Sequence, residues 1–287
     1  MWPVFMKIIV TGGSGFVGSH TIKALREKGY EVFNFDIKEG YDILDTMQLR
    51  EKIRPGDKVL HLAAVARFGE ADEDPWLAYQ TNIVGTHNVV QACKAHQAER
   101  LVYSSTGSVY MPIEEEPPIT EDFKCRGNSV YACTKYLGDL EIRIKKMPYI
   151  ILRYAHLYGE GRMDHGAIGG FISRMKRGLA PTLYGGQQSN DFTYIKDIVQ
   201  ANILALESDK LNEIYNIGTG EETTTEEVFK KMKMYFGYDK EFERLPLRSV
   251  DPLRFVFDIS KAKAMLRYKP EYDFDKGLKD YLENEKV

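Results

Sequence analysis

The chain has 287 residues, of which 43% are hydrophobic, so it can bury a full core, and this argues against disorder. Its 39 basic and 42 acidic residues give a formal net charge of -3, without the clustered basic excess of a nucleic-acid binder, so no nucleic acid is expected as a partner. The three cysteines, Cys93, Cys125 and Cys133, lack metal-binding spacing, and we expect no metal site and a reducing, cytoplasmic location.

The first ten residues, MWPVFMKIIV, are too short for a membrane span and lead directly into a glycine-rich loop, so no membrane partner is expected. Beyond them, short apolar runs alternate with helical patterns as far as about residue 158. The expected strands are KIIVTG, EVFNFD, KVLHLAA, RLVYSS and YIILRY, and the expected helices cover 15–28, 47–53, 76–96 and the segment that contains SVYACTK. This alternation predicts the α/β class, with a doubly wound (Rossmann) parallel sheet.

The regular alternation fades after about Tyr158, where glycine-rich connections interrupt short helical stretches. One more strand, EIYNIG, is expected to return to the sheet. Three later helical stretches, TTEEVFKKMKMYFG, ISKAKAML and FDKGLKDYLENE, indicate a smaller C-terminal α/β domain over the carboxyl ends of the strands. We therefore predict a Rossmann domain over 1–160, to which 187–217 returns, and a small substrate-binding domain made of 161–186 and 218–287.

A glycine-rich loop, TGGSGFVGSH, joins the first expected strand to the first expected helix. It satisfies both G-x-G-x-x-G and G-x-x-G-x-x-G, a pattern that lets the backbone approach a pyrophosphate at the positive end of a helix. The alternative is a glycine-rich turn without a ligand, but the strand before it and the helix after it favour binding. The loop residues predicted to contact the cofactor are Gly12, Gly15, Phe16, Val17 and Gly18.

Asp36 ends the second expected strand, 18 positions beyond Gly18. A carboxylate there can accept hydrogen bonds from both hydroxyls of a ribose, and it would repel a 2'-phosphate. The sequence therefore favours NAD over NADP as the cofactor.

Tyr131 and Lys135 lie four positions apart in SVYACTK, so on a helix they share one face. Such a pair is often a solvated face with an extended lysine. A phenol titrates near ~10 in water, but a neighbouring ammonium favours the phenolate, which can take a proton from a substrate hydroxyl. The spacing is consistent with a general base tuned by a lysine.

These motifs, taken together and in order, resemble those of the extended short-chain dehydrogenases/reductases. Within that group the chain most resembles the NAD-dependent nucleotide-sugar epimerase/dehydratase family, of the UDP-glucose 4-epimerase kind. The further matching segments are HLAA at 61–64, SSTGSVY at 104–110, LRYAHLYG at 152–159, DFTYIKDI, YNIGTG and RSVDPLRFVFDISKAKAML. The resemblance implies NAD as the cofactor, a nucleotide sugar as the substrate, and a homodimer formed through the helix that carries Tyr131 and the helix before it.

The family pattern assigns roles to further residues of this chain. The implied cofactor contacts are Asp42, Ile43, Leu62, Ala63, Ala64, Asn82, Ser104, Tyr131, Lys135, Tyr154 and His156. The implied substrate contacts are Arg67, Thr106, His156, Arg248 and Asp251. Alternatives stay open for four of these: Asn82 as a hydrogen-bonding helix residue, Arg67 as a surface cation, Arg248 in a surface salt bridge, and His156 as a buried, satisfied histidine.

The implied catalytic set is Thr106, Tyr131 and Lys135, with Thr106 holding the reacting oxygen and Tyr131 acting as the base. Dehydratases of the family carry an Asp and a Glu after the threonine, because eliminating water needs a further acid and base. This chain has Gly107 and Ser108 there, which favours an epimerase, most simply a UDP-sugar 4-epimerase that forms a transient 4-keto sugar. The alternatives are a nucleotide-sugar reductase or dehydratase, and a non-catalytic NAD-binding sensor.

Two positions depart from the family pattern and bear on which substrate is used. His156 stands where relatives usually have Asn, and it differs from Asn in shape and charge. Asn190 stands where many relatives have Arg, which removes an expected phosphate contact.

Overall fold

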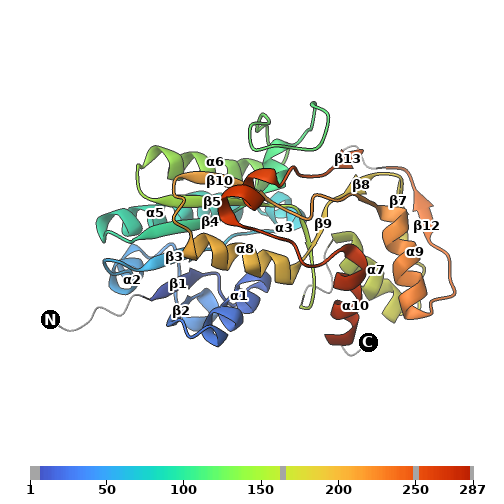
Figure 1. Ribbon diagram of the computed structural model, residues 1–287, viewed down its shortest axis with the longest axis horizontal. Coiled ribbons are helices and arrows are strands. Elements are labelled where there is room, and N and C mark those ends of the chain that lie inside the picture. Colours follow the sequence, from blue (N-terminus) through green and yellow to red (C-terminus); the bar gives the residue numbers. More distant parts are fainter. Residues whose placement is uncertain (1–6, 162–165, 248–251, 285–287) are drawn as a thin grey trace.

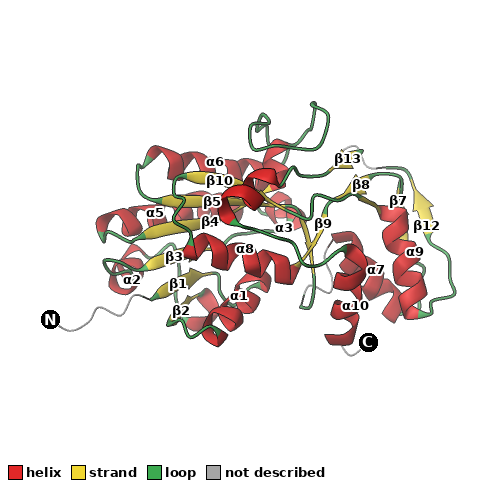
Figure 2. Ribbon diagram, in the orientation of Figure 1, coloured by secondary structure: helices red, strands yellow, loops and turns green. Residues whose placement is uncertain are grey.

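The computed structural model describes residues 7–161, 166–247 and 252–284 (Figure 1). Arg248 and Asp251, two of the predicted substrate contacts, lie outside the described residues. The chain forms a large central sheet with helices on both faces and a group of smaller sheets and helices at one end (Figure 2).

The central sheet has six parallel strands in the order β10-β5-β4-β3-β1-β2. The strands are β1 (Ile8–Thr11), β2 (Val32–Phe35), β3 (Lys58–His61), β4 (Arg100–Thr106), β5 (Tyr149–Tyr154) and β10 (Glu213–Ile217). β2 lies on one side of β1, and β3, β4, β5 and β10 follow one another on its other side. The direction in which strands are added therefore reverses between β1 and β3. The predicted doubly wound parallel sheet is confirmed, and so is the return of EIYNIG to it.

Successive strand residues face opposite sides of the sheet, so two helical layers can cover it. Val10 belongs to a core that includes Leu25 of α1, and Ile9 belongs to a second core that includes Val90 of α5. One layer contains α1 (Phe16–Glu27) and α8 (Ile195–Glu207), and the other contains α2 (Thr46–Lys52), α5 (Thr86–Ala95) and α6 (Val130–Ile144). The parallel strands are thereby buried on both faces, as their near-continuous apolar sequences predict.

The single long helix expected over 76–96 is instead built from three pieces. They are α4 (Pro75–Tyr79), a π-helix η2 (Gln80–Gly85) and α5, preceded by a short helix α3 (Phe68–Glu73) that the sequence analysis did not predict. The widened turns of η2 contain Asn82, which hydrogen-bonds outside its own helix. π-Turns are frequent at functional sites. The stretch ISKAKAML likewise contains a π-helix, η4 (Ala262–Leu266).

The remaining elements gather at one end of the molecule, on the right in Figure 1. They comprise three small sheets and three helices: β6 (His156–Tyr158), β7 (Thr182–Tyr184), β8 (Ser189–Asn190), β9 (Phe192–Tyr194), β11 (Thr223–Thr224), β12 (Glu243–Leu245), β13 (Arg254–Phe255), α7 (Gly166–Lys176), α9 (Thr225–Phe236) and α10 (Phe274–Asn284). The segment 187–217 contains α8, which covers the central sheet, and β10, which belongs to that sheet. The same segment also contains β8, which pairs with β11 and β13 in the smaller part. The exact domain boundaries stay a prediction.

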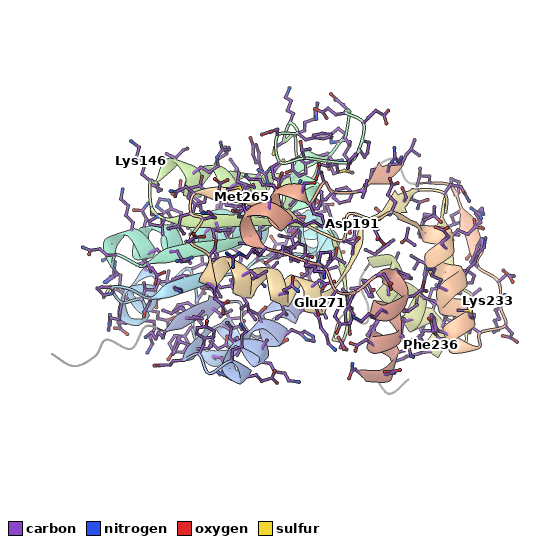
Figure 3. The ribbon with its side chains drawn as sticks, in the orientation of Figure 1. Lys146, Asp191, Lys233, Phe236, Met265 and Glu271 are labelled. Carbon is purple, nitrogen blue, oxygen red and sulfur yellow. The ribbon has the colours of Figure 1, made fainter. Side chains whose placement is uncertain are left out.

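Asp191 joins the central sheet to this smaller part, and Figure 3 labels it between the two. The buried carboxylate accepts hydrogen bonds from Thr193 Oγ1, from the Thr219 backbone and hydroxyl, and from the Gly220 backbone. These bonds fix the path of the chain as it leaves β10. In the described ranges, no helix is both long and apolar enough to cross a bilayer.

Candidate functional site

Most of the predicted site residues that the structure describes lie at the carboxyl edge of the central sheet. The ends of β1, β2 and β3 are level, because Thr11 is in register with Phe35 and with His61. The ends of β4 and β5 are level at Thr106 and Tyr154, three residues beyond Tyr103, the partner of His61. The loops after β1, β2, β3, β4 and β5 therefore meet at one edge, around the point where the strand order reverses. Ligands bind at this point in sheets of this class.

The glycine loop fits a dinucleotide pyrophosphate. Gly12 has a φ of 69°, and a Cβ on it would lie 2.6 Å from the Cα of Ala63, so the loop is packed closely against the segment after β3. Helix α1 begins directly after Gly15, which supplies no side-chain cap. The first backbone N–H groups of α1 are thus left for an anionic ligand. The N–H of Leu62 donates to the carbonyl of Thr11 (3.0 Å). This bond holds the segment after β3 beside the glycine loop.

Asp36 connects the glycine loop to the end of β2. One carboxylate oxygen accepts from the Ser14 backbone N–H (3.0 Å) and the other from that of Lys38 (2.9 Å), which starts the short 3-10 helix η1 (Ile37–Glu39). A carboxylate has about four acceptor positions, so two remain for ribose hydroxyls. The arrangement is therefore compatible with the predicted ribose contact.

Asp42 and Ile43 lie in the next loop. Asp42 is exposed and its carboxylate accepts from the Leu44 backbone N–H (2.8 Å). Ile43 is buried and its end contacts Gly85 of η2. Their place on the adenine side stays a proposal.

Asn82 holds the loop after β3 against α6. Its carbonyl oxygen accepts from the Val65 N–H (2.8 Å), and its amide donates to the Val65 carbonyl (3.0 Å) and to Thr134 Oγ1 (3.0 Å). The side chain is 1% exposed. These bonds favour the alternative in which Asn82 is a hydrogen-bonding helix residue. They also hold Val65, which follows the segment Leu62, Ala63 and Ala64.

Thr106 ends β4 and starts the 3-10 helix η3 (Gly107–Tyr110). Its hydroxyl accepts from the Ser108 N–H and donates to the Ser108 hydroxyl, both at 3.2 Å. Ser104, on the same strand, is 9% exposed and Thr106 is 8% exposed. The threonine hydroxyl is therefore fixed at the strand end, beside Tyr154 of β5.

Tyr131 and Lys135 occupy the first two turns of α6, which Ser129 caps by accepting from the Ala132 N–H (3.2 Å). The half-buried Tyr131 ring packs edge-on against Phe68, with ring centres 5.2 Å apart. Burial raises the pKa of Tyr154, and the nearby Tyr131 hydroxyl adds to that rise. Helix α6 packs against β4 and against η3, so Tyr131 lies on the helix that covers the end of β4 at Thr106.

Lys135 is 2% exposed. Burial lowers the pKa of its ammonium group from 10.5 to about 7, although the Asp139 carboxylate opposes this fall. A lysine with a folded-state pKa below its unfolded value destabilises the fold fully below the folded pKa, and this penalty fades as the pH rises toward the unfolded pKa.

Replacing Lys135 with Met is therefore expected to stabilise the cofactor-free protein by about 3–5 kcal/mol at pH 7, with the gain vanishing as the pH approaches 10.5. Urea unfolding at several pH values measures this free energy. Lys94→Met, which changes an exposed lysine on α5, serves as the control. A loss of stability on changing Lys135 at pH 7 would contradict the interpretation.

His156 was predicted either to contact the ligands or to be a buried histidine, and its position contradicts the second interpretation. It is exposed at the start of β6, with its ring edge-on to Phe255 (centres 4.9 Å apart, planes at 83°). The interpretation as a buried histidine is wrong, because the chain turns away from the central sheet after Tyr154 to pair with β9. Tyr154 itself is buried and donates to Asn202 Oδ1 of α8 (2.5 Å), so its hydroxyl is engaged by the protein.

Arg67 precedes α3 and forms an exposed ion pair with Glu70 (2.8 Å). This position favours its alternative interpretation as a surface cation. Among the described residues, no cluster of His, Cys, Asp and Glu could hold a metal ion.

The sequence analysis missed a buried polar network behind Lys135. Asp139, one turn further along α6, accepts from Arg153 Nε (3.0 Å) and Nη2 (2.9 Å), and Arg153 Nη1 donates to Tyr110 (2.8 Å). Tyr110 in turn donates to Asn216 of β10 (2.8 Å). The signal in the sequence is an arginine in the otherwise apolar strand YIILRY, since a buried charge needs a partner.

The fold and the site together define an extended short-chain dehydrogenase/reductase. A model of the NAD dependent epimerase/dehydratase family matches residues 8–218. A putative UDP-glucose 4-epimerase of Methanocaldococcus jannaschii is 34% identical, with 95% of this chain and 96% of the relative covered. A UDP-N-acetyl-alpha-D-glucosaminuronate decarboxylase of Bacillus cytotoxicus is 29% identical over 96% of this chain and 97% of its own.

Among solved structures, the UDP-glucose 4-epimerase of Thermotoga maritima with UDP-glucose superimposes with a TM-score of 0.90. It is 32% identical, and the match covers 98% of this chain and 99% of that one. The chain therefore belongs to the NAD-dependent epimerase/dehydratase family, and its cofactor is NAD. The resemblance seen in the sequence is confirmed.

Proposed function

We propose that the protein is a UDP-sugar 4-epimerase that works by transient oxidation of the sugar. The observation that carries this proposal is the Tyr131–Lys135 pair in the first two turns of α6, a helix that packs against β4 and against η3, which begins after Thr106. Bound NAD would supply the acceptor, and then the donor, of the hydride. The glycine loop, Asp36 and the Leu62–Ala64 segment are the residues that would hold NAD.

In this proposal Tyr131 takes the proton of the sugar 4-hydroxyl while the hydrogen on the same carbon leaves as hydride, giving a 4-keto group. The Thr106 hydroxyl, which donates to Ser108 in the structure, would turn to donate to the reacting oxygen, and Lys135 favours the phenolate of Tyr131 by its charge. After the keto sugar turns in the site, Tyr131 returns the proton as hydride is returned to C4. The proton and the hydride both return to the sugar, so no net NADH is formed.

The surroundings of Gly107 support epimerisation over dehydration. A Cβ on Gly107 would lie 2.4 Å from Cζ of Phe255 and 2.7 Å from Cζ of Phe257. An acidic side chain therefore has no room directly after Thr106. Two other functions are distinguished in other ways. A net reductase would consume NADH in a 1:1 ratio with its product. A non-catalytic sensor does not require both Tyr131 and Lys135, and this chain has both.

The proposal is tested by incubating the purified protein with UDP-, GDP-, dTDP- and CDP-sugars, without added cofactor, and following the sugar protons by NMR. A UDP-sugar converted to its C4 epimer without net NADH is the expected result. Inversion at another carbon, or turnover only with added NADH, would overturn it. The panel also identifies the sugar and the nucleotide. The exposed His156, and Asn190 on β8 beside β11 and β13, are the two departures from the family pattern that bear on this choice.

We further propose that the smaller part, with β8, β11 and β13, binds the nucleotide portion of the substrate. The cytoplasmic location stays a prediction.

A homodimer is proposed to form through α6 and the helices before it. Several large apolar side chains are exposed there, including Trp76 (67%), Val84 (49%), Leu137 (46%) and Ile144 (70%). Leu137 and Ile144 are two turns apart, so they share one face of α6. A contiguous exposed apolar surface is typical of protein interfaces.

Sedimentation equilibrium is expected to give twice the mass of one chain. Replacing Leu137 and Ile144 with Glu should give a monomer, because a charge would be buried in the interface. Replacing Met234, an exposed residue of α9, with Glu is the matched control and should leave the dimer intact. A wild-type protein that sediments as a single chain would contradict the proposal.

A further inference from the structure

The ammonium group of Lys135 lies on the face of a buried aromatic ring. Its Nζ is 4.1 Å from the centre of the Tyr103 ring on β4. Tyr103 is 0% and Lys135 is 2% exposed, so water does not compete for this contact. The negative face of an aromatic ring attracts a cation, more strongly when both are desolvated.

Tyr103 is held in place from two directions. Its hydroxyl donates to the Lys135 backbone carbonyl (3.4 Å) and lies against Gly138, where a Cβ would be 2.3 Å from the hydroxyl oxygen. The ring of His61 lies 5.5 Å away and is inclined by 33°. His61 itself is bound to Thr11 Oγ1 (2.6 Å) and Thr86 Oγ1 (2.9 Å). The ring is therefore fixed between α6 and the strands that line the cofactor edge.

The other groups around Lys135 do not replace this contact. His61 on β3 is neutral at physiological pH, because burial, and then the charge of Lys135, lower its pKa to about 3. On α6, the Asp139 carboxylate also favours the charged form of Lys135, but one of its oxygens is bound by Nε and Nη2 of Arg153 of β5, which share its charge. Tyr131 of α6 and Tyr154 of β5 carry phenol groups, which are neutral at physiological pH unless their pKa is lowered. The ring of Tyr103 is thus in direct contact with the ammonium group, with 4.1 Å between Nζ and the ring centre.

We propose that Tyr103 is a positioning residue: its ring holds Lys135 in place as a charged ammonium group, so that this charge can act on Tyr131 one helical turn away. The inference rests on the proposed function, in which Lys135 favours the phenolate of Tyr131. The phenol hydroxyl of Tyr103 has a secondary role, which is to orient the ring.

The test measures the charge of Lys135 directly, without cofactor or substrate. Lysines are labelled with ¹³C at Cε, the Lys135 signal is assigned from its loss in Lys135→Met, and its shift is followed with pH. Tyr103→Leu, which removes the ring, is expected to lower the Lys135 pKa by about one unit, whereas Tyr103→Phe should change it by less than about 0.3 units. Tyr215→Leu is the matched control, because Tyr215 is a buried tyrosine on β10 whose ring faces a different lysine, Lys261, at 5.3 Å.

A change of packing in Tyr103→Leu is separated from a change of electrostatics by a second variant. Introducing 3,4,5-trifluorophenylalanine at position 103 keeps the shape of the ring and removes its negative face. It is expected to lower the Lys135 pKa relative to Tyr103→Phe. An unchanged Lys135 pKa in this variant, or an equal fall in Tyr103→Phe, would overturn the proposal.

The dependence of kcat/KM on pH links the same variants to the reaction. The pH at which kcat/KM reaches its plateau is expected to rise by about one unit in Tyr103→Leu and to stay unchanged in Tyr103→Phe. If Lys135 titrates as expected in all variants but no nucleotide sugar is turned over by the wild type, the proposed function fails while the ring contact stands. If turnover is found but the profile does not move, the positioning role fails.

Discussion

Replacing Tyr131 with Phe is expected to lower kcat by on the order of 10³-fold, while the protein still contains its NAD. The phenol hydroxyl is the proposed proton acceptor, and its loss leaves no group at the same place on α6 to take the proton. The ring itself remains, so its edge-on contact with Phe68 (ring centres 5.2 Å apart) should persist. The residues proposed to hold NAD, in the glycine loop and at Asp36, are untouched.

The measurement has two parts, turnover of the sugar found in the NMR panel and the amount of NAD released on denaturation. Tyr136→Phe is the matched control, because Tyr136 is a half-buried tyrosine on the same helix that packs into the core. Its activity is expected to stay within about threefold of the wild type, since it would remove no proton acceptor. Near-normal kcat in Tyr131→Phe would rule out the phenol as the base.

The second large effect concerns stability. Replacing Asp139 with Asn is expected to lower the free energy of unfolding by about 3–5 kcal/mol, because it leaves the buried guanidinium of Arg153 without its counter-charge. Asp139 and Arg153 are 0% and 2% exposed, and two guanidinium nitrogens donate to the same carboxylate oxygen. Burial raises the Asp139 pKa, and the guanidinium of Arg153 counteracts this rise.

Urea unfolding with an unchanged m-value measures the loss. Glu222→Gln is the control, since it removes one partner of the more exposed pair with Arg254 and should cost less than about 1 kcal/mol. The double variant Asp139→Leu with Arg153→Met should recover most of the stability, because it removes both charges. Equal losses in Asp139→Asn and Glu222→Gln would show that the buried ion pair contributes no more to the free energy of unfolding than the exposed pair does.

The parts of the fold that the sequence predicted are those encoded by local patterns. The strands from KIIVTG to YIILRY are short apolar runs between turn residues, and their order in the chain determines a doubly wound sheet. The glycine loop and Asp36 were found because their residue types are dictated by backbone geometry and by charge. For the same reason Tyr131 and Lys135 could be placed on one helix face before the structure was known.

What the sequence did not reveal depends on contacts between distant segments. The π-turn at Asn82 follows from bonds to Val65 and Thr134, which are 17 and 52 positions away. The exposure of His156 depends on the pairing of β6 with β9, and the contact of Lys135 on α6 is with the ring of Tyr103 on β4. Periodicity describes one element at a time, so it cannot identify such partners.

The central claim is that hydride leaves C4 of the sugar and returns to the same carbon within one binding event. The direct test uses the UDP-sugar identified by the NMR panel, carrying deuterium at C4, incubated in ordinary water with the protein and its bound cofactor. The account predicts that the C4 epimer retains the deuterium, because hydride does not exchange with solvent. Replacement of deuterium by hydrogen from water would mean that C4 is inverted by proton removal, and it would contradict the account.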